Sequence, residues 1–146
     1  MISLRHLLDT CFLSDLTKAV PPAGLEAWSR ANNAEECAIS VVTIGELRHG
    51  INILPEGRRR TELRDWIARD VLQRFADRTV DVTVEIAEAW AGLTAQARLS
   101  RRTLSVPDGL ILATAAVHRL TVVTRNIRDF SGYDVPIVNP WGTAST

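Results

Sequence analysis

The stretch SVPDGLILATAAVHRLTVVTRNIRDF, residues 105–130, predicts a helix, a turn, a buried strand and a polar loop, in that order. Ser105 suits a helix N-cap, and Pro107 suits the first helical turn. Apolar residues then recur at three- and four-residue steps as far as Leu120, which predicts a helix with a broad apolar face. The short run LTVV at 120–123 is typical of a strand buried in a parallel sheet.

Two acidic residues flank the apolar part of this stretch. Asp108 opens the helix, and Asp129 lies in the polar loop TRNIRDF that follows the strand. In open α/β sheets, ligands bind at the carboxyl ends of the strands. Because carboxylates that converge there from separate elements can share a cation, the two acids form a candidate metal site.

The rest of the chain continues the alternation of strand and helix. Further strands are expected at residues 5–9, 37–42, 79–82 and 136–138, and further helices at 10–18, 23–31, 43–52, 58–76 and 83–99. This alternation predicts an α/β fold, with a central, mostly parallel sheet of about five strands and helices on both faces. We expect a single domain over residues 1–146, with a core at about 5–139 and a loose C-terminal tail at 140–146.

The composition narrows the function classes. The 146 residues carry 17 basic and 17 acidic side chains, so net charge gives no overall attraction to nucleic acid. All the basic residues except Lys18 are arginine, which suits bidentate phosphate contacts. No apolar run approaches the ~20 residues that span a bilayer, and no signal peptide is visible. We therefore expect a cytoplasmic protein, with no membrane partner and with Cys11 and Cys37 as reduced thiols.

Four acids fall at the ends of predicted elements: Asp9, Glu46, Asp108 and Asp129. Hydrolysis of a phosphodiester needs an activated water and stabilised charge on the attacking and leaving oxygens. Mg²⁺ or Mn²⁺ ions held by hard oxygen ligands supply both, so clustered carboxylates suit this chemistry.

Each acid also has a purely structural interpretation. Asp9 can cap the helix that follows it, and Asp108 can complement a helix dipole. Glu46 can close a capping box with Thr43, and Asp129 can stabilise a turn.

Three motifs together go further than any single acid. PDGLILATA followed by VTRNIRDF, LLDTCFLSDL near the N-terminus, and VVTIGELRHGI resemble the PIN-domain ribonucleases, especially the VapC- and FitB-type toxins of type II toxin–antitoxin pairs. The resemblance covers residues 6–138. It implies that Asp9, Glu46 and Asp108 are metal-binding catalytic acids.

The fourth ligand is less well defined. The resemblance implies a further ligand from the loop after the fourth strand, where Asp129 is favoured by its charge and Asn126 lies closer to the strand end. Thr10 and Thr124 are expected neighbours of the site. Four arginines are candidate contacts to an RNA backbone, since such contacts position a nucleic acid: Arg58, Arg101, Arg125 and Arg128.

Cys11 departs from the pattern, because similar proteins commonly have asparagine there and a thiol is a weak hydrogen-bond partner. A thiolate beside the acids would also favour Zn²⁺.

The sequence therefore supports two candidate functions. The first is an endoribonuclease toxin that acts on structured RNA such as tRNA, forms a homodimer or a higher assembly, and is inhibited by a small antitoxin. The second, favoured by Cys11, is a catalytically weak PIN-like module that binds RNA or protein.

Overall fold

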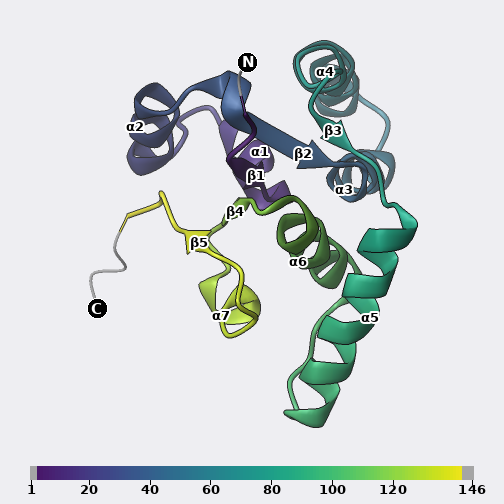
Figure 1. Ribbon diagram of the computed structural model, residues 1–146. Helices are drawn as coiled ribbons and strands as arrows, with labels where there is room; N and C mark the ends of the chain where they lie inside the picture. Colours follow the sequence, from purple (N-terminus) through teal and green to yellow (C-terminus); the bar gives the residue numbers. More distant parts are fainter. Residues whose placement is uncertain (1–2, 143–146) are drawn as a thin grey trace.

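Short parallel strands form the centre of the computed structural model, which describes residues 3–142 (Figure 1). In chain order the strands are β1 (His6–Leu8), β2 (Cys37–Ser40), β3 (Thr79–Val80), β4 (Thr121–Val123) and β5 (Ile137–Val138). They form a 5-stranded sheet in the order β3-β2-β1-β4-β5, and every pairing between neighbours is parallel. The predicted α/β class is confirmed, and the sheet is parallel throughout.

Helices connect these strands. They are α1 (Thr10–Leu16), α2 (Ala23–Ala31), α3 (Val41–Asn52), α4 (Arg58–Trp66), α5 (Val84–Leu99), α6 (Val106–His118) and α7 (Ile127–Phe130), with a 3-10 turn η1 (Ala34–Glu36) and a π-helix η2 (Ile67–Gln73). Within the part of the chain that is described, none of them is long and apolar enough to cross a membrane.

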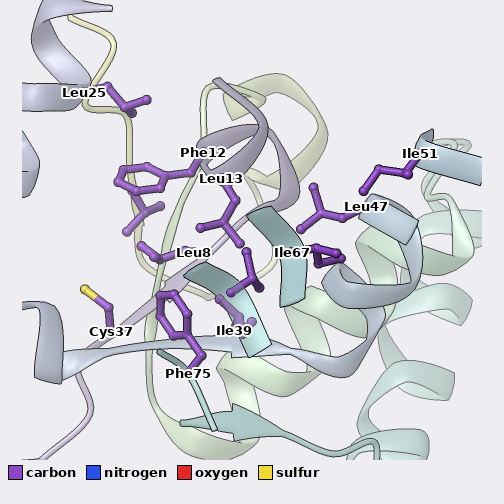
Figure 2. Packing of buried hydrophobic residues seen from close by; sticks show 12 residues of the cluster. Leu8, Phe12, Leu13, Leu25, Cys37, Ile39, Leu47, Ile51, Ile67 and Phe75 are labelled. Carbon is purple, nitrogen blue, oxygen red and sulfur yellow. The ribbon is translucent and has the colours of Figure 1, made fainter. Parts of the chain in front are cut away.

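The sheet separates two hydrophobic clusters. Leu8 and Ile39 belong to the first cluster, which α1, α2, α3 and η2 complete (Figure 2). Their chain neighbours Leu7 and Ala38 belong to the second cluster, which is completed by α5, α6 and α7. Because successive residues of a strand point to opposite faces, both faces of the sheet are covered by helices, as predicted.

Helix α6 agrees closely with the sequence prediction. Ser105 is its N-cap, and the Ser105 hydroxyl accepts a hydrogen bond from the Asp108 amide at 3.2 Å. The helix ends at Arg119, which adopts a left-handed conformation with φ 56°. Gly109 allows α5 to approach, since a Cβ at that position would lie 2.9 Å from the Trp90 ring.

The boundary between β2 and α3 differs from the prediction. The sequence predicts a strand two residues longer, but β2 ends at Ser40 and α3 begins at Val41. The Ser40 hydroxyl caps α3 by accepting a hydrogen bond from the Val42 amide at 3.0 Å. This cap overrides the strand preference of the two valines. The interpretation of Glu46 as part of a capping box with Thr43 is therefore wrong, because the N-cap of α3 is Ser40.

Other elements also differ from the prediction. The helix predicted over 58–76 consists of α4 and η2, and the strand predicted over 79–82 is reduced to two residues. The short helices η1 and α7 have no counterpart in the sequence prediction, because each is too short for a helical period to be recognised.

The segment after β5 is packed, which corrects the predicted loose tail for two residues. Pro140 is buried, and the Trp141 ring lies edge-on to Phe12 with 6.1 Å between centroids. Gly24 of α2 makes room for this segment, since a Cβ there would collide with the Pro140 carbonyl oxygen. Residues 143–146 of the predicted tail lie outside the described residues.

Candidate metal centre

The expected site residues lie where three neighbouring strands end. Asp9 directly follows β1, and Glu46 belongs to the helix that follows β2. Thr124 directly follows β4, and Asp129 lies in the short helix α7 beyond it. Because β1 lies between β2 and β4, all these residues come to the carboxyl edge of the sheet, where Asp108 opens α6.

Asp9 is buried, with 3% of its surface exposed, and both its carboxylate oxygens have partners. Oδ1 accepts a hydrogen bond from the Thr10 amide at 2.8 Å, so Asp9 does cap α1. Oδ2 accepts from the Thr124 hydroxyl at 2.8 Å and from the Cys11 thiol at 3.3 Å. The capping role and a metal role are compatible, because Oδ1 keeps a lone pair free.

Glu46 is tied to the same helix. Its Oε1 accepts a hydrogen bond from the Thr10 hydroxyl at 2.6 Å, and that hydroxyl lies 3.4 Å from Thr43 Oγ1. Thr43 is fully buried, so this link lies between α1 and α3 rather than at the surface. Of the predicted neighbours, Thr10 therefore binds both Asp9 and Glu46 directly, and Thr124 binds Asp9.

The pKa of Asp108 reflects the charges of the other three acids. Burial raises the pKa of Asp108 to about 6, against a hydrogen bond from Ser105 that lowers it. The negative charges of Asp9, Glu46 and Asp129 raise the pKa of Asp108 further. Each of these carboxylates therefore lies within electrostatic reach of Asp108.

This group fits a divalent cation by its chemistry. It offers oxygen ligands and a concentration of negative charge, which hard cations such as Mg²⁺ prefer. Over residues 3–142, however, no three histidine, cysteine, aspartate or glutamate side chains form a ready-made ligand set. The charges of the other three carboxylates act on Asp108, but in the described residues the four carboxylates do not form a complete coordination shell.

The two candidates for the fourth ligand differ in their surroundings. Asn126 uses its backbone amide to bind the Thr124 hydroxyl at 3.0 Å, and its side chain does not cap α7. Asp129 lies exposed in the only turn of α7, and its charge acts on Asp108. Of the two side chains, only that of Asp129 contributes charge to the site.

The thiol of Cys11 is held protonated. Burial and the negative charge of Asp9 raise the pKa of Cys11 to about 11. A thiolate ligand for Zn²⁺ is therefore not favoured here, because a soft metal requires the deprotonated sulfur.

The four arginine candidates are not equivalent. Arg125 forms an ion pair with Asp15 at 2.8 Å, and Arg58 forms one with Glu62 at 3.0 Å on α4. Arg128 is exposed on α7, beside Asp129. Arg101 lies in the turn after α5, and no hydrogen bond or ion pair joins it or Arg58 to the four acids within the described residues.

Sequence reasoning missed Asp15, a buried acid of α1 with 3% of its surface exposed. One local signal was available, since Asp15 stands on a helix between the apolar residues Leu13 and Leu16. A charge in such a position requires a partner, although the sequence does not identify it.

Comparison with known proteins defines the class. The model of the PIN domain family matches residues 6–135, and the chain therefore belongs to this family. Its relatives include the VapC ribonuclease Y4jK of Sinorhizobium fredii, with 36% identity over 94% of this chain and 99% of the relative. The toxin FitB of Neisseria gonorrhoeae is 32% identical over 92% of this chain and 97% of the relative.

Solved structures agree with these relatives. The crystal structure of FitAcB from Neisseria gonorrhoeae matches with a TM-score of 0.87 and 32% identity, over 93% of this chain and 98% of that one. FitAB bound to the IR36 DNA fragment also gives a TM-score of 0.87, at 30% identity over 94% of this chain and 96% of that one. The resemblance to VapC- and FitB-type toxins is confirmed.

Proposed function

We propose that the chain is a metal-dependent endoribonuclease toxin of a toxin–antitoxin pair, acting in the cytoplasm as a single PIN domain. The observation that carries the proposal is that Asp9, Glu46 and Asp108 meet at the carboxyl edge of the sheet, where burial and then the charges of Asp9, Glu46 and Asp129 raise the pKa of Asp108 to about 6. Relatives named as a ribonuclease and as a toxin, aligned over nearly the whole chain, support it.

The four carboxylates would hold Mg²⁺ or Mn²⁺. A bound ion of this kind supplies a nucleophilic water and stabilises charge on the leaving oxygen of a phosphodiester. The chain's own residues orient the ligands: Thr124 and the Thr10 amide fix Asp9, and the Thr10 hydroxyl fixes Glu46. Asp108 must be ionised to act as a ligand, and a bound cation would offset the neighbouring negative charges that raise its pKa.

The substrate proposed is structured RNA such as tRNA, cut to leave a 5′-phosphate and a 3′-hydroxyl. Zero net charge means that RNA binding depends on local basic residues rather than on the overall field. Arg128 is the best-placed candidate, because it is exposed on the same short helix as Asp129.

The antitoxin would cover an apolar groove between the helices of the first cluster. A cavity of about 250 Å³ lies there, lined by Phe12 and Leu16 of α1, Trp28 of α2 and Trp66 of α4. Trp66 also lines a second cavity of about 310 Å³, which is bordered by Thr10 and Glu46. An inhibitor could follow this path and insert an arginine among the acids.

A homodimer, or a higher assembly with the antitoxin, belongs to the same proposal. Exposed apolar side chains just before α5, at its two ends and at the start of α6 are candidates for such contacts: Val82, Val84, Leu99 and Val106.

The test compares Asp108→Asn with Asp134→Asn on the same RNA, with Mn²⁺ and with EDTA. Asp134 is an exposed acid with φ 57°, a conformation that asparagine adopts readily, so its replacement is a matched control. We expect cleavage by the wild type and by Asp134→Asn, and none by Asp108→Asn or in EDTA. Undiminished metal-dependent cleavage by Asp108→Asn would contradict the site assignment.

A second candidate is a PIN-like module that binds RNA or protein and cuts weakly. Cys11 favours it, because a thiol is a weak hydrogen-bond partner even where it contacts Asp9 at 3.3 Å and Thr124 at 3.7 Å. RNA retention without cleavage in Mn²⁺ would support this candidate.

A further inference from the structure

Asp15 of α1 is a buried carboxylate that the proposed metal site does not use. Its Oδ1 lies 3.0 Å from the Lys18 ammonium. Its Oδ2 accepts hydrogen bonds from Arg125 Nη1 and from Trp141 Nε1, both at 2.8 Å. Burial alone would raise the pKa of Asp15, but hydrogen bonds from Lys18 and Trp141 and the charge of Arg125 hold that pKa below its usual value.

Arg125 belongs to the turn that binds Asp9. In this turn, residues 124–126, the Thr124 hydroxyl donates to Asp9 Oδ2 and accepts from the Asn126 amide. The guanidinium of the intervening Arg125 reaches Asp15. The 124–126 turn therefore contacts α1 at two points, at its N-cap Asp9 and near its C-terminal end.

The aromatic contacts around Arg125 restrict its side chain. Its guanidinium carbon lies 5.9 Å from the centroid of the Trp141 ring, and this ring packs against Phe12 of α1. About half of the Arg125 side chain is exposed, but the charged group is bound to a buried partner. This arrangement holds the guanidinium in one place and limits its freedom to follow a phosphate.

We propose that the Asp15–Arg125 ion pair positions the metal-binding acids, an inference that rests on the proposed nuclease function. Asp9 begins α1 and Asp129 follows the 124–126 turn, so the placement of α1 against this turn sets how the two carboxylates lie. The ion pair gives the 124–126 turn a second contact with α1, in addition to the bond between Thr124 and Asp9, and so fixes the angle between the turn and the helix. Arg125 then acts on the site through Thr124 and is not a contact to RNA.

The matched control is Lys18→Met. Lys18 binds the same carboxylate, but it lies just past the end of α1, three residues from Asp15, so this pair does not link α1 to the 124–126 turn. Trp141→Phe is a second comparison, since it removes the Nε1–H donor and keeps an aromatic ring on Phe12.

The primary variant is Arg125→Met, measured for RNA cleavage and for the Mn²⁺ concentration that gives half-maximal rate. Displacement of a catalytic group by about 1 Å can cost about a hundredfold in rate, so we expect kcat to fall by about tenfold or more. The half-maximal Mn²⁺ concentration should rise, and the KM for RNA should change little. Lys18→Met should stay within about twofold of the wild type, and Arg125→Lys should recover part of the loss.

Arg125→Met leaves a buried carboxylate with fewer partners, which destabilises the fold. The double variant Asp15→Asn/Arg125→Met removes both charges together and is expected to fold while it still lacks the link. It should show the same loss of kcat as the single variant. A double variant with wild-type kcat and metal dependence would overturn the proposal.

Amide hydrogen exchange provides a readout that needs no activity. The amides of Thr10 and Asn126 donate to Asp9 and to Thr124, so both should exchange faster in the Arg125 variants than in Lys18→Met. If the wild type does not cut RNA but this pattern holds, the proposed function fails and the positioning role stands. Unchanged amide exchange in the Arg125 variants would overturn the positioning role. A rise in the KM for RNA with no change in kcat would also overturn it, and would indicate that Arg125 contacts an RNA phosphate.

Discussion

The Thr10 hydroxyl donates a hydrogen bond to Glu46 Oε1 across 2.6 Å and so joins the helix after β1 to the helix after β2. The amide of the same residue donates to Asp9 Oδ1 at 2.8 Å. One threonine therefore orients two carboxylates that come from different strands.

Thr10→Val is expected to weaken cleavage because it removes only the hydroxyl and keeps the shape of the side chain. A hydrogen bond to a charged group contributes about 1.5–3 kcal/mol, which corresponds to about tenfold or more in rate if the bond persists in the transition state. Thr10→Ser retains the hydroxyl and should cut at nearly the wild-type rate. Equal rates for the valine and serine variants at saturating Mn²⁺ would show that this bond does not orient Glu46.

Asp108 should make the metal-free protein less stable as the pH rises. Its pKa of about 6 in the folded state exceeds the ordinary value of 3.8, so the folded state binds the proton more tightly than the unfolded state. This stabilisation is complete below the ordinary value and is lost as the pH rises through about 6. Asp108→Asn lacks this titration.

Thermal melts in EDTA at a pH near 4.5 and at a pH near 7.5 check this expectation. From the lower to the higher pH, the melting temperature of the wild type should fall further than that of Asp108→Asn. At the higher pH, Mn²⁺ should raise the melting temperature of the wild type more than that of the variant, because a ligand of the folded state stabilises it. Parallel pH profiles would contradict the raised pKa.

The parts of the fold that local signals determine could be predicted from the sequence. Helix α6 carries its own cap in Ser105, its own start in Pro107 and its own apolar spacing. Asp108 and Asp129 could be proposed as one site because ligands of open α/β sheets bind at the carboxyl ends of the strands, and the resemblance to PIN-domain ribonucleases added Asp9 and Glu46.

What the sequence could not provide depends on residues far apart in the chain. Asp15 binds Arg125 at a separation of 110 residues and Trp141 at 126, and no local pattern connects them. The same contacts explain why the segment at Pro140 is packed, although its composition is that of a loose tail. The end of β2 was missed for a different reason, since the Ser40 cap competes with two valines whose propensity favours the strand.

Cys11 should react slowly with alkylating reagents in the native protein. Burial and the charge of Asp9 raise its pKa to about 11, so the reactive thiolate is scarce at neutral pH. Mass spectrometry after brief iodoacetamide treatment at a pH near 8 should find Cys11 largely unmodified in the native chain and modified in denaturant. Equal labelling of the native and denatured chains would mean that the thiol is ionised beside Asp9, and would reopen a zinc site.

Asp129→Asn should weaken cleavage more than Asn126→Ala does. The charge of Asp129 acts on Asp108, whereas Asn126 contributes its backbone amide, which alanine retains. Loss of a carboxylate ligand should raise the half-maximal Mn²⁺ concentration on the order of tenfold. Removal of the groups that support a metal site typically weakens metal binding by about tenfold to a hundredfold, and this shift is at the lower end of that range.

Arg128→Gln is the matched control for this comparison, because Arg128 is exposed on the same short helix and carries no ligand oxygen. It should alter the KM for RNA and leave the Mn²⁺ dependence unchanged. If Asn126→Ala instead raises the half-maximal Mn²⁺ concentration more than Asp129→Asn does, the fourth ligand is the Asn126 side chain, and α7 must rearrange when the ion binds.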